Sequence, residues 1–574
     1  MNTKKVALML LELANLMELR GDNPFKVNAY RRAARALENS RVSLEVLRER
    51  PEELAGVGKG TAAAIREILE TGELEQLKQL KEELPAGLPS LLEIPGLGPK
   101  SIHALYRELK ITNLDELEEA VKEGRIRNLA GFGEKKEKNM LEGIRNYRER
   151  PRHHLLVHAL PIAEKILKRL QELPEVSRAE TAGSLRRMKE TVKDIDLVVA
   201  TEAPSAVAKV LTEMPEVTKV VASGEKKVSL LIDLGLEIQV DVRLVAPSQF
   251  ISTLHHFTGS KEHNVRIRQR AKEFGWKVSE YGICDPAKGE DFAFREEKEL
   301  YEKLQLPYVA PEIREDRGEF ERTADELPRL IRLEDYRGDL HMHTRWSDGT
   351  GSIKEMALAA QKRGYRYIAV TDHSQSLRVA GGLTAEDLKR QREEIEAVNE
   401  EMKDFTVLAG VEMDILPDGR LDFSDEVLKE LDLVIASIHS SFQQDEETIT
   451  RRVLNAMENP YVHIIAHPTG RLINRRGPYA LHLDRVFQKA KETGTILELN
   501  SHPYRLDLND IYLKKGKEEY GLTFSINTDA HAPEGFDFIN MGVATARRGW
   551  LEPADVINTW PLDQLLERLN GNHS

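Results

Sequence analysis

The stretch His341-Met342-His343 opens the pattern that decides the fold of the second half of the chain. It ends an apolar segment, and six further apolar segments follow, separated by sequence typical of helices. Strands that alternate with helices in this way form parallel sheets. From residue 337 onward the sequence therefore predicts a (β/α) barrel, with strands at 339–343, 367–373, 407–413, 433–439, 462–467, 495–500 and 523–529.

Histidines and carboxylates gather where these expected strands end. Barrel enzymes place their active sites at the carboxyl ends of the strands, so these side chains are expected to meet. A single histidine at such a point is usually structural, whereas nine metal-ligating side chains at the same recurrent position predict a metal centre. The nine residues are His341, His343, Asp348, His373, Glu412, His439, His467, Asp529 and His531.

A second group of acidic residues lies in the middle of the chain. Asp194 and Asp196 are two residues apart on an expected strand, so their side chains share a face. Asp241 lies on the expected strand 237–245, and a neighbouring position would bring it alongside. Three carboxylates repel one another unless cations bind between them, and oxygen ligands suit Mg²⁺ or Mn²⁺. The sequence therefore predicts a two-ion site for phosphoryl transfer.

Glycine turns recur in the first part of the chain, at spacings of 40 and 35 residues. Glycine lets a backbone approach a phosphate closely, and the N–H groups of a following helix face that phosphate. The turns resemble helix-hairpin-helix modules, which bind DNA backbones without reading sequence. They are Gly56-Val57-Gly58, Gly96-Leu97-Gly98 and Gly131-Phe132-Gly133.

Length and composition limit the class of protein. A chain of 574 residues is expected to hold several domains. Its net charge of −13 does not favour a polyanion partner, but the first fifty residues carry ten Lys or Arg against six Asp or Glu. The single cysteine, Cys284, excludes an internal disulfide framework and fits a reducing cytoplasm. With no secretory signal or spanning segment in the sequence, we expect a cytoplasmic, nucleoid-associated protein without a membrane partner.

The acidic group and the segment His256-Phe257-Thr258-Gly259-Ser260 together resemble a family X DNA polymerase of the polymerase beta type, over about residues 3–310. The resemblance implies that Asp194, Asp196 and Asp241 are the catalytic triad and bind two Mg²⁺ or Mn²⁺ ions. It also implies a set of nucleotide-binding residues, which are Gly183, Ser184, Arg187, His256, Phe257, Gly259, Asn264 and Arg268.

The same resemblance implies gapped or primer–template DNA with a 5′-phosphate, and dNTPs, as partners of a monomeric enzyme. His256 stands where the family has Tyr, so discrimination against ribose does not carry over. The lysine that forms a Schiff base in polymerase beta falls on Ala64, so no lyase by that route is expected. The expected DNA-binding residues are Lys26, Tyr30, Gly56, Gly58, Lys59, Gly96, Gly98, Lys100, Gly131 and Gly133.

The histidine and carboxylate pattern resembles the PHP (polymerase and histidinol phosphatase) domain over about residues 336–574. The resemblance implies up to three Mn²⁺, Zn²⁺ or Fe ions, held by the nine residues, with Glu412 as a catalytic bridge between two ions. Asp348 stands where many members have His, which keeps a ligand. Arg420 and Arg378 are considered as phosphate-binding residues, without a motif to support either.

The expected fold is a multidomain α+β and α/β chain that ends in a distorted (β/α)7 PHP barrel. Its parts are a helical DNA-end-binding domain with a helix-hairpin-helix at 1–85, a second helical subdomain at 86–150, a nucleotidyltransferase palm at 151–246, a nucleotide-selecting thumb at 247–315, a linker at 316–335 and the PHP domain at 336–574.

The predicted function is DNA-directed synthesis that fills short gaps in base excision repair. The barrel is expected to act as a Mn²⁺-dependent 3′–5′ exonuclease, with cleavage at abasic sites as a further activity. Two alternatives stay open for the barrel, a phosphatase of small molecules and a structural metal-bound module. For the front half, the alternative is a non-enzymatic scaffold that binds DNA ends.

Overall fold

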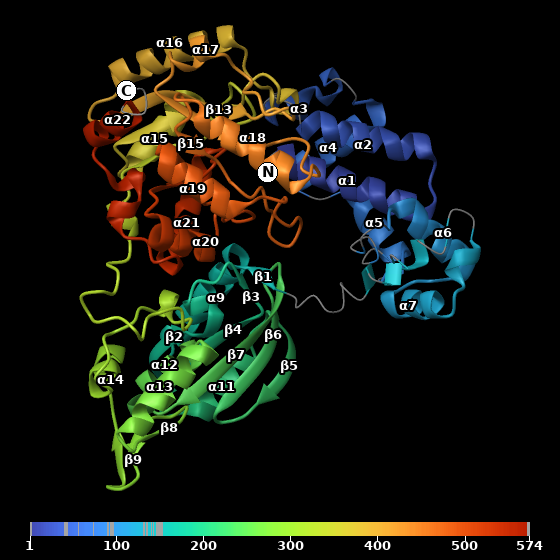
Figure 1. Ribbon diagram of the computed structural model, residues 1–574. Helices are drawn as coiled ribbons and strands as arrows, with labels where there is room; N and C mark the ends of the chain where they lie inside the picture. The colour runs from blue at the N-terminus through green and yellow to red at the C-terminus, as the bar shows by residue number, and fades with distance from the viewer. Residues whose placement is uncertain are drawn as a thin grey trace. The chain divides into compact units, whose positions relative to one another are not determined.

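The computed structural model forms two compact units, Met1–Arg152 and His153–Ser574, and each is described by itself (Figure 1). The structure describes residues 3–570 apart from 39–43, 55–56, 73, 86, 89–90, 92–93, 95–96, 130–131, 134–135, 139, 142 and 145–152. No helix among these residues is long and apolar enough to cross a membrane.

The first unit is helical. One hydrophobic core, with buried residues from Val6 to Ile144, runs through both of the segments expected at 1–85 and 86–150. Long α1 packs against α2, α5 and α6, which holds the two segments together. The helices are α1 (Thr3–Arg20), α2 (Pro24–Glu38), α3 (Leu44–Glu49), α4 (Lys59–Thr71), α5 (Glu75–Glu83), α6 (Pro99–Leu109) and α7 (Leu114–Lys122).

A five-stranded mixed sheet opens the second unit, with strand order β2-β4-β7-β6-β5. Central β4 and β7 are parallel, and the other neighbours are antiparallel. Helices α9 (Leu156–Gln171), α10 (Gly183–Arg186) and α12 (Phe250–Thr258) contact β4. The strands are β2 (Val176–Thr181), β4 (Asp194–Thr201), β5 (Val217–Ser223), β6 (Lys227–Asp233) and β7 (Glu237–Val245).

A small subdomain follows the sheet, with helices α13 (Lys261–Glu273) and α14 (Glu297–Lys303) around a three-stranded sheet. That sheet consists of β8 (Lys277–Val278), β9 (Ile283–Asp285) and β10 (Glu290–Phe292).

The segment 316–335, which the sequence predicts to be a linker, is packed. Glu319 is fully buried, and its Oε1 lies 2.8 Å from Nδ1 of His263 on α13. Ile331 belongs to the core of the barrel that follows. The segment is therefore anchored at both ends, although its charged composition suggests a solvated connection.

Seven parallel strands form the last part in the order β11 to β17, as the sequence pattern predicts. A bridge between Met342 and Ala530 nearly closes the sheet into a barrel. The strands are β11 (Gly338–Asp339), β12 (Tyr367–Val370), β13 (Thr406–Asp414), β14 (Leu433–Ser437), β15 (Ile464–Ile465), β16 (Ile496–Asn500) and β17 (Phe524–Asn527). Several are shorter than expected, because the backbone leaves the sheet before the polar residues at its carboxyl end.

Helices surround this barrel (Figure 1). Residues of the barrel's loops, Ile473 and Leu506, are buried in the same core cluster as the mixed sheet, so sheet and barrel pack directly on each other. The principal helices are α15 (Ile353–Lys362), α16 (Ala385–Glu401), α18 (Glu446–Glu458), α19 (Leu483–Thr493), α20 (Asp510–Lys515), α21 (Ile539–Arg548) and α22 (Leu562–Asn570).

Two candidate metal centres

The first centre lies on the parallel pair at the middle of the mixed sheet. The register pairs Asp196 of β4 with Asp241 of β7, and Asp194 stands two residues before Asp196. Residues two apart on a strand share a face, so all three carboxylates meet on one face of the sheet. The strand placement that the sequence predicts for Asp241 is thus confirmed.

Crowding of negative charge shows in the acidity of these groups. Burial, together with the neighbouring carboxylates of Asp194 and Asp241, raises the pKa of Asp196 to about 7. Burial and Asp241 also raise the pKa of Asp194. The three carboxylates offer only oxygen ligands, and their negative charge is not fully balanced by nearby cations. Such a site fits a hard divalent cation.

Lys227 supplies part of the missing positive charge. Its Nζ lies 2.9 Å from Oδ2 of Asp241, and Nε2 of Gln239 donates to Oδ1 of the same side chain. Although burial raises the pKa of Asp241, the hydrogen bond from Lys227 leaves it lower than usual. Asp241 is therefore ionised and poised to share its oxygens with a cation.

The backbone turns at Gly183, close to the carboxylate of Asp196. Gly183 has a φ of +61°, which L side chains rarely adopt, and a Cβ built on it would overlap Oδ2 of Asp196. Ser184 follows it in the short helix α10, and Arg187 follows the helix. Nε of Arg187 lies 3.0 Å from Oε1 of Glu315, and its Nη1 donates to the carbonyl oxygen of Thr258 at 2.6 Å.

Most of the other expected nucleotide-binding residues lie at the start of the small subdomain. The ring of His256 packs edge-on against Phe257, and the guanidinium of Arg243 covers Phe257 at 4.3 Å. Nδ2 of Asn264 donates to the carbonyl oxygen of His256 at 2.7 Å, which fixes that helix end. Arg268 is exposed and lines a small pocket together with His256 and Asn264.

The expected DNA-binding residues of the first unit are placed in two ways. Lys26, Lys59 and Lys100 are exposed, whereas Tyr30 is buried and donates its hydroxyl hydrogen to Gln76. Gly58 and Gly98 are the N-caps of α4 and α6, as expected for hairpin turns, and Gly133 is exposed. The remaining turn glycines, Gly56, Gly96 and Gly131, lie outside the described residues.

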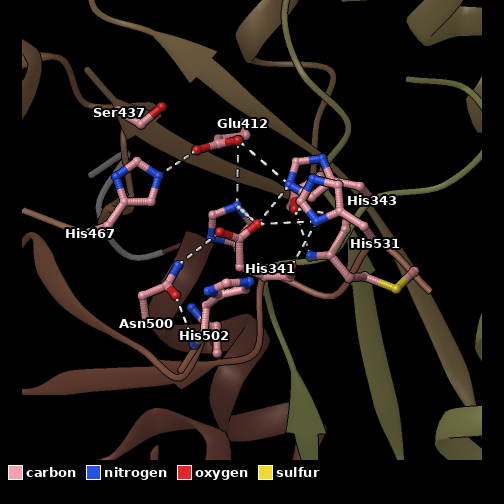
Figure 2. A network of polar contacts seen from close by, with 12 residues as sticks. His341, His343, Glu412, Ser437, His467, Asn500, His502 and His531 are labelled. Atoms are coloured by element: carbon pink, nitrogen blue, oxygen red, sulfur yellow. Dashed lines mark hydrogen bonds and ion pairs between the residues drawn. The ribbon is translucent and has the colours of Figure 1, made fainter. Parts of the chain in front are cut away.

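The second centre lies at the carboxyl ends of the barrel strands, where Figure 2 shows Glu412 between His467 and the group of His343 and His531. All nine expected residues gather there. Eight of them form three clusters in which the ligand atoms lie within 4.8 Å of one another, and His467 lies beside Glu412. The clusters are His343, Asp348, His373 and His531; His341, His343 and Asp529; and His373, Glu412 and His439.

Glu412 is central to this arrangement. Its Oε1 lies 3.0 Å from Nε2 of His467 and 3.2 Å from Nε2 of His439. Its Oε2 faces the other side, 2.8 Å from Nδ1 of His373 and 3.5 Å from Nε2 of His341. The two carboxylate oxygens thus face two different sets of imidazoles, as a group that bridges two ions requires.

Buried ring nitrogens without hydrogen bonds test whether the cluster suits metal ions. Nε2 of His341 and Nδ1 of His343 make no hydrogen bond, although both rings are fully buried. A buried polar atom without a partner is costly, and a metal ion would supply that partner. The donor set therefore fits metal.

Without bound metal, protons on two histidines of the barrel centre offset part of the negative charge of its carboxylates. Burial lowers the pKa of His439, but the Glu412 and Asp414 carboxylates outweigh it and raise the pKa to about 10. The pKa of His531 is likewise raised, to about 9, by Asp348 and Asp529 against burial. Because a coordinating imidazole must be neutral, metal uptake by these residues releases protons.

Two buried carboxylates that the sequence analysis did not select support the ligands. Oε1 of Glu498 lies 2.7 Å from Nδ1 of His341, and Oδ1 of Asp414 lies 3.3 Å from Nδ1 of His439. Such partners fix the tautomer and orientation of a metal-binding imidazole. The available signal was a charged residue inside an apolar strand, Ile496-Leu497-Glu498-Leu499.

Of the arginines, Arg505 lies nearest to the ligands among those described. Its Nε is 3.7 Å from Oδ2 of Asp529, and its side chain is 20% exposed. Arg420 instead pairs with Asp418 at the surface, and Arg378 is exposed at the start of a short 3₁₀ helix. The structure therefore favours Arg505 over the two arginines considered from the sequence.

The fold and the two centres define a class: a polymerase beta-like palm and thumb joined to a PHP barrel. Family models match four parts of the chain: a helix-hairpin-helix domain at residues 1–74, a SAM-like helix-hairpin-helix tandem at 88–146, the DNA polymerase beta thumb at 253–315 and the PHP domain at 339–502.

Similar proteins cover the chain to different extents. The DNA polymerase/3′-5′ exonuclease PolX of Bacillus subtilis (strain 168) is 47% identical over 572 residues, which is 100% of both chains. A probable phosphatase of Syntrophotalea carbinolica is 28% identical over 41% of this chain and 96% of its own length. A probable phosphatase of Thermoanaerobacter sp. (strain X514) is 34% identical over 34% of this chain and 78% of its own length. The chain belongs to the family X DNA polymerases with helix-hairpin-helix and PHP domains.

Proposed function

We propose that this chain is a DNA-directed DNA polymerase and a 3′–5′ exonuclease, with synthesis at the sheet centre and degradation at the barrel centre. The observation that carries the first activity is the register that sets Asp196 against Asp241 beside Asp194. Full-length similarity to a protein named as a DNA polymerase and 3′-5′ exonuclease supports both activities.

At the sheet centre, Arg187 and Ser184 hold the triphosphate of the dNTP on the turn that Gly183 permits. Asp194, Asp196 and Asp241 bind two Mg²⁺ or Mn²⁺ ions, which supply charge neutralisation in the phosphoryl transfer. Phe257, Asn264 and Arg268 line the nucleotide pocket and the template side. With His256 in place of the usual tyrosine, we infer that selection against ribose depends on the backbone that Asn264 fixes.

Loss of the carboxylates tests this assignment. In Asp194→Ala with Asp196→Ala, dNTP incorporation on a gapped template should fall to background, because two of three metal-binding groups are gone. Pyrophosphate release measures the reaction directly. Normal incorporation by this variant would contradict the polymerase assignment.

At the barrel centre, the nine side chains bind up to three Mn²⁺, Zn²⁺ or Fe ions, which lower the pKa of bound water toward neutrality. Arg505 holds the scissile phosphate, and Glu412 would be the ligand that two of the ions share. His341→Ala with His343→Ala should stop digestion of a 3′-labelled primer while synthesis continues. Unchanged digestion would place the nuclease elsewhere.

A phosphatase of small phosphate esters is the second candidate for the barrel, because relatives that match this part of the chain are named probable phosphatases. Comparison of the wild-type chain on p-nitrophenyl phosphate and on a 3′-labelled primer separates the two. The nuclease assignment predicts strong preference for the primer.

The cellular role that we propose is the filling of short gaps in base excision repair by a cytoplasmic, nucleoid-associated monomer. Abasic-site cleavage at the barrel belongs to the same proposal. Exposed Lys26 and Lys59 support recognition of a 5′-phosphate, since ammonium groups bind phosphate. Gapped substrates with and without the 5′-phosphate test it: the phosphate should speed filling, and Lys26→Ala should remove that advantage.

A further inference from the structure

An arginine of the PHP domain reaches the sheet centre, which is the proposed polymerase centre. Arg548 is the last residue of α21, and its side chain is buried where the barrel meets the palm. Its Nη1 donates to the carbonyl oxygen of Arg187 at 2.7 Å. Its Nη2 lies 2.9 Å from Oδ2 of Asp510, which holds the guanidinium from the barrel side.

Glu315 joins the same two arginines through one oxygen. Its Oε1 lies 3.0 Å from Nε of Arg187 and 3.0 Å from Nη1 of Arg548. The side chains of Arg187 and Glu315 are only 11% and 14% exposed, so water screens these contacts weakly. Arg548 is therefore linked to Arg187 in two ways. It binds the backbone carbonyl of Arg187 directly, and it shares Glu315 with the guanidinium of Arg187.

The pairing has a consequence for nucleotide binding. A triphosphate that binds Arg187 competes with Glu315 for the positive charge of its guanidinium. A nearly buried carboxylate left without a partner is costly, and here it would also repel the triphosphate. With Arg548 still bound to the same oxygen, Glu315 keeps a positive partner during this exchange.

We propose that Arg548 is a positioning residue of the polymerase centre: it retains Glu315 and so frees Arg187 for the triphosphate. The inference rests on the proposed polymerase function. It gives the barrel a part in nucleotide binding that is separate from the chemistry of its own metal cluster.

Arg548→Met in the full-length chain tests the proposal. Among the described residues, Arg187 would then be the remaining cation in an ion pair with Glu315, and the KM for dNTP on gapped DNA should rise about tenfold with kcat little changed. Equilibrium binding of dNTP to the complex with a dideoxy-terminated primer should weaken by the same factor.

A second substitution distinguishes this role from a loss of packing. Adding Glu315→Gln to Arg548→Met removes the carboxylate that competes for Arg187, so the dNTP affinity should return toward that of the wild type. If Arg548 only supported the fold, the double variant would be worse than either single one.

Arg547→Met is the matched control. Arg547 is the neighbouring residue on α21 and binds Glu312 and the carbonyl oxygen of Ile331, with no contact to Arg187 or Glu315 in the described structure. It should leave the dNTP KM unchanged. Nuclease rates of all variants report whether the chain is folded.

An unchanged KM in Arg548→Met with normal nuclease activity, or absence of rescue by Glu315→Gln, would overturn the proposal. These results differ from those expected if the polymerase assignment itself is wrong, because the wild-type chain would then incorporate no nucleotide. Arg548→Lys, which keeps one cation near Glu315, should show an intermediate KM.

Discussion

At the scale of single residues, Gly183 and Asp196 occupy the same small volume of the polymerase centre. Gly183→Ala would place a methyl group on Oδ2 of Asp196 and force an unfavourable positive φ. Incorporation should fall at least about a hundredfold, since a misplacement of 1 Å can cost that much. The nuclease rate is the control, and normal incorporation by Gly183→Ala would show that Asp196 does not act from this position.

Glu498 supports the barrel centre through hydrogen bonds from the ring of His341 and from the backbone N–H of His467. Glu498→Gln removes the negative charge that orients this imidazole and raises its basicity. Metal affinity should fall about 10- to 100-fold, as for other partners of metal-binding histidines. Calorimetric titration of the metal-free chain with Mn²⁺ measures the change, and equal affinity would exclude a supporting role.

Arg505 and Arg420 provide a matched pair for the nuclease. Removal of the cation beside Asp529 in Arg505→Ala should slow 3′-end digestion about 10- to 100-fold, because charged contacts to a phosphate are worth roughly 1.5–3 kcal/mol. Arg420→Ala, which alters an exposed side chain paired with Asp418, should digest normally. A larger loss in Arg420→Ala would reverse this assignment.

At the scale of elements, the parallel pair of β4 and β7 combines burial of carboxylates with electrostatic repulsion between them. The pKa of Asp196 is raised from 3.8 to about 7, so ionisation disfavours the folded state. In metal-free buffer the contribution of this group to the free energy of unfolding should decrease as the pH rises from about 4 to about 7. Full ionisation costs about 4 kcal/mol, at roughly 1.4 kcal/mol for each pKa unit between 3.8 and about 7.

Asp196→Asn should remove that loss. The variant should therefore gain stability relative to the wild type as the pH rises through this range in chelator, measured by denaturant unfolding. Added Mg²⁺ should reverse the order, because it stabilises the wild-type centre. A pH-independent difference between the two proteins would contradict the repulsion inferred for this pair of strands.

Sequence periodicity predicted the barrel strands and both acidic strands, because apolar runs with polar residues at their ends are a local signal. The packing of 316–335 has no such signal: Glu319 is buried through a hydrogen-bonded partner, His263, that lies far away in the chain. Arg505 was missed for the same reason, and the charged residue in an apolar strand that marks Glu498 does not show that its partner is His341. Their roles depend on which residues the closed barrel brings together.

At the scale of the whole molecule, the net charge of −13 is compatible with a nucleic-acid substrate. Part of the negative charge lies in the two centres, where carboxylates cluster and could hold metal ions. Gly58 and Gly98 are the N-caps of α4 and α6, and the backbone N–H groups at a helix start are not counted in the net charge. We expect salt-sensitive binding at gaps, with little affinity for undamaged duplex.

We infer that one chain synthesises DNA at the palm and degrades it at the barrel. The most direct test follows a gapped, 3′-labelled DNA with Mn²⁺, with and without dNTPs, for the wild type and two variants. Asp194→Ala with Asp196→Ala should only shorten the primer, and His341→Ala with His343→Ala should only extend it. Loss of both activities in either folded variant would contradict two separate centres.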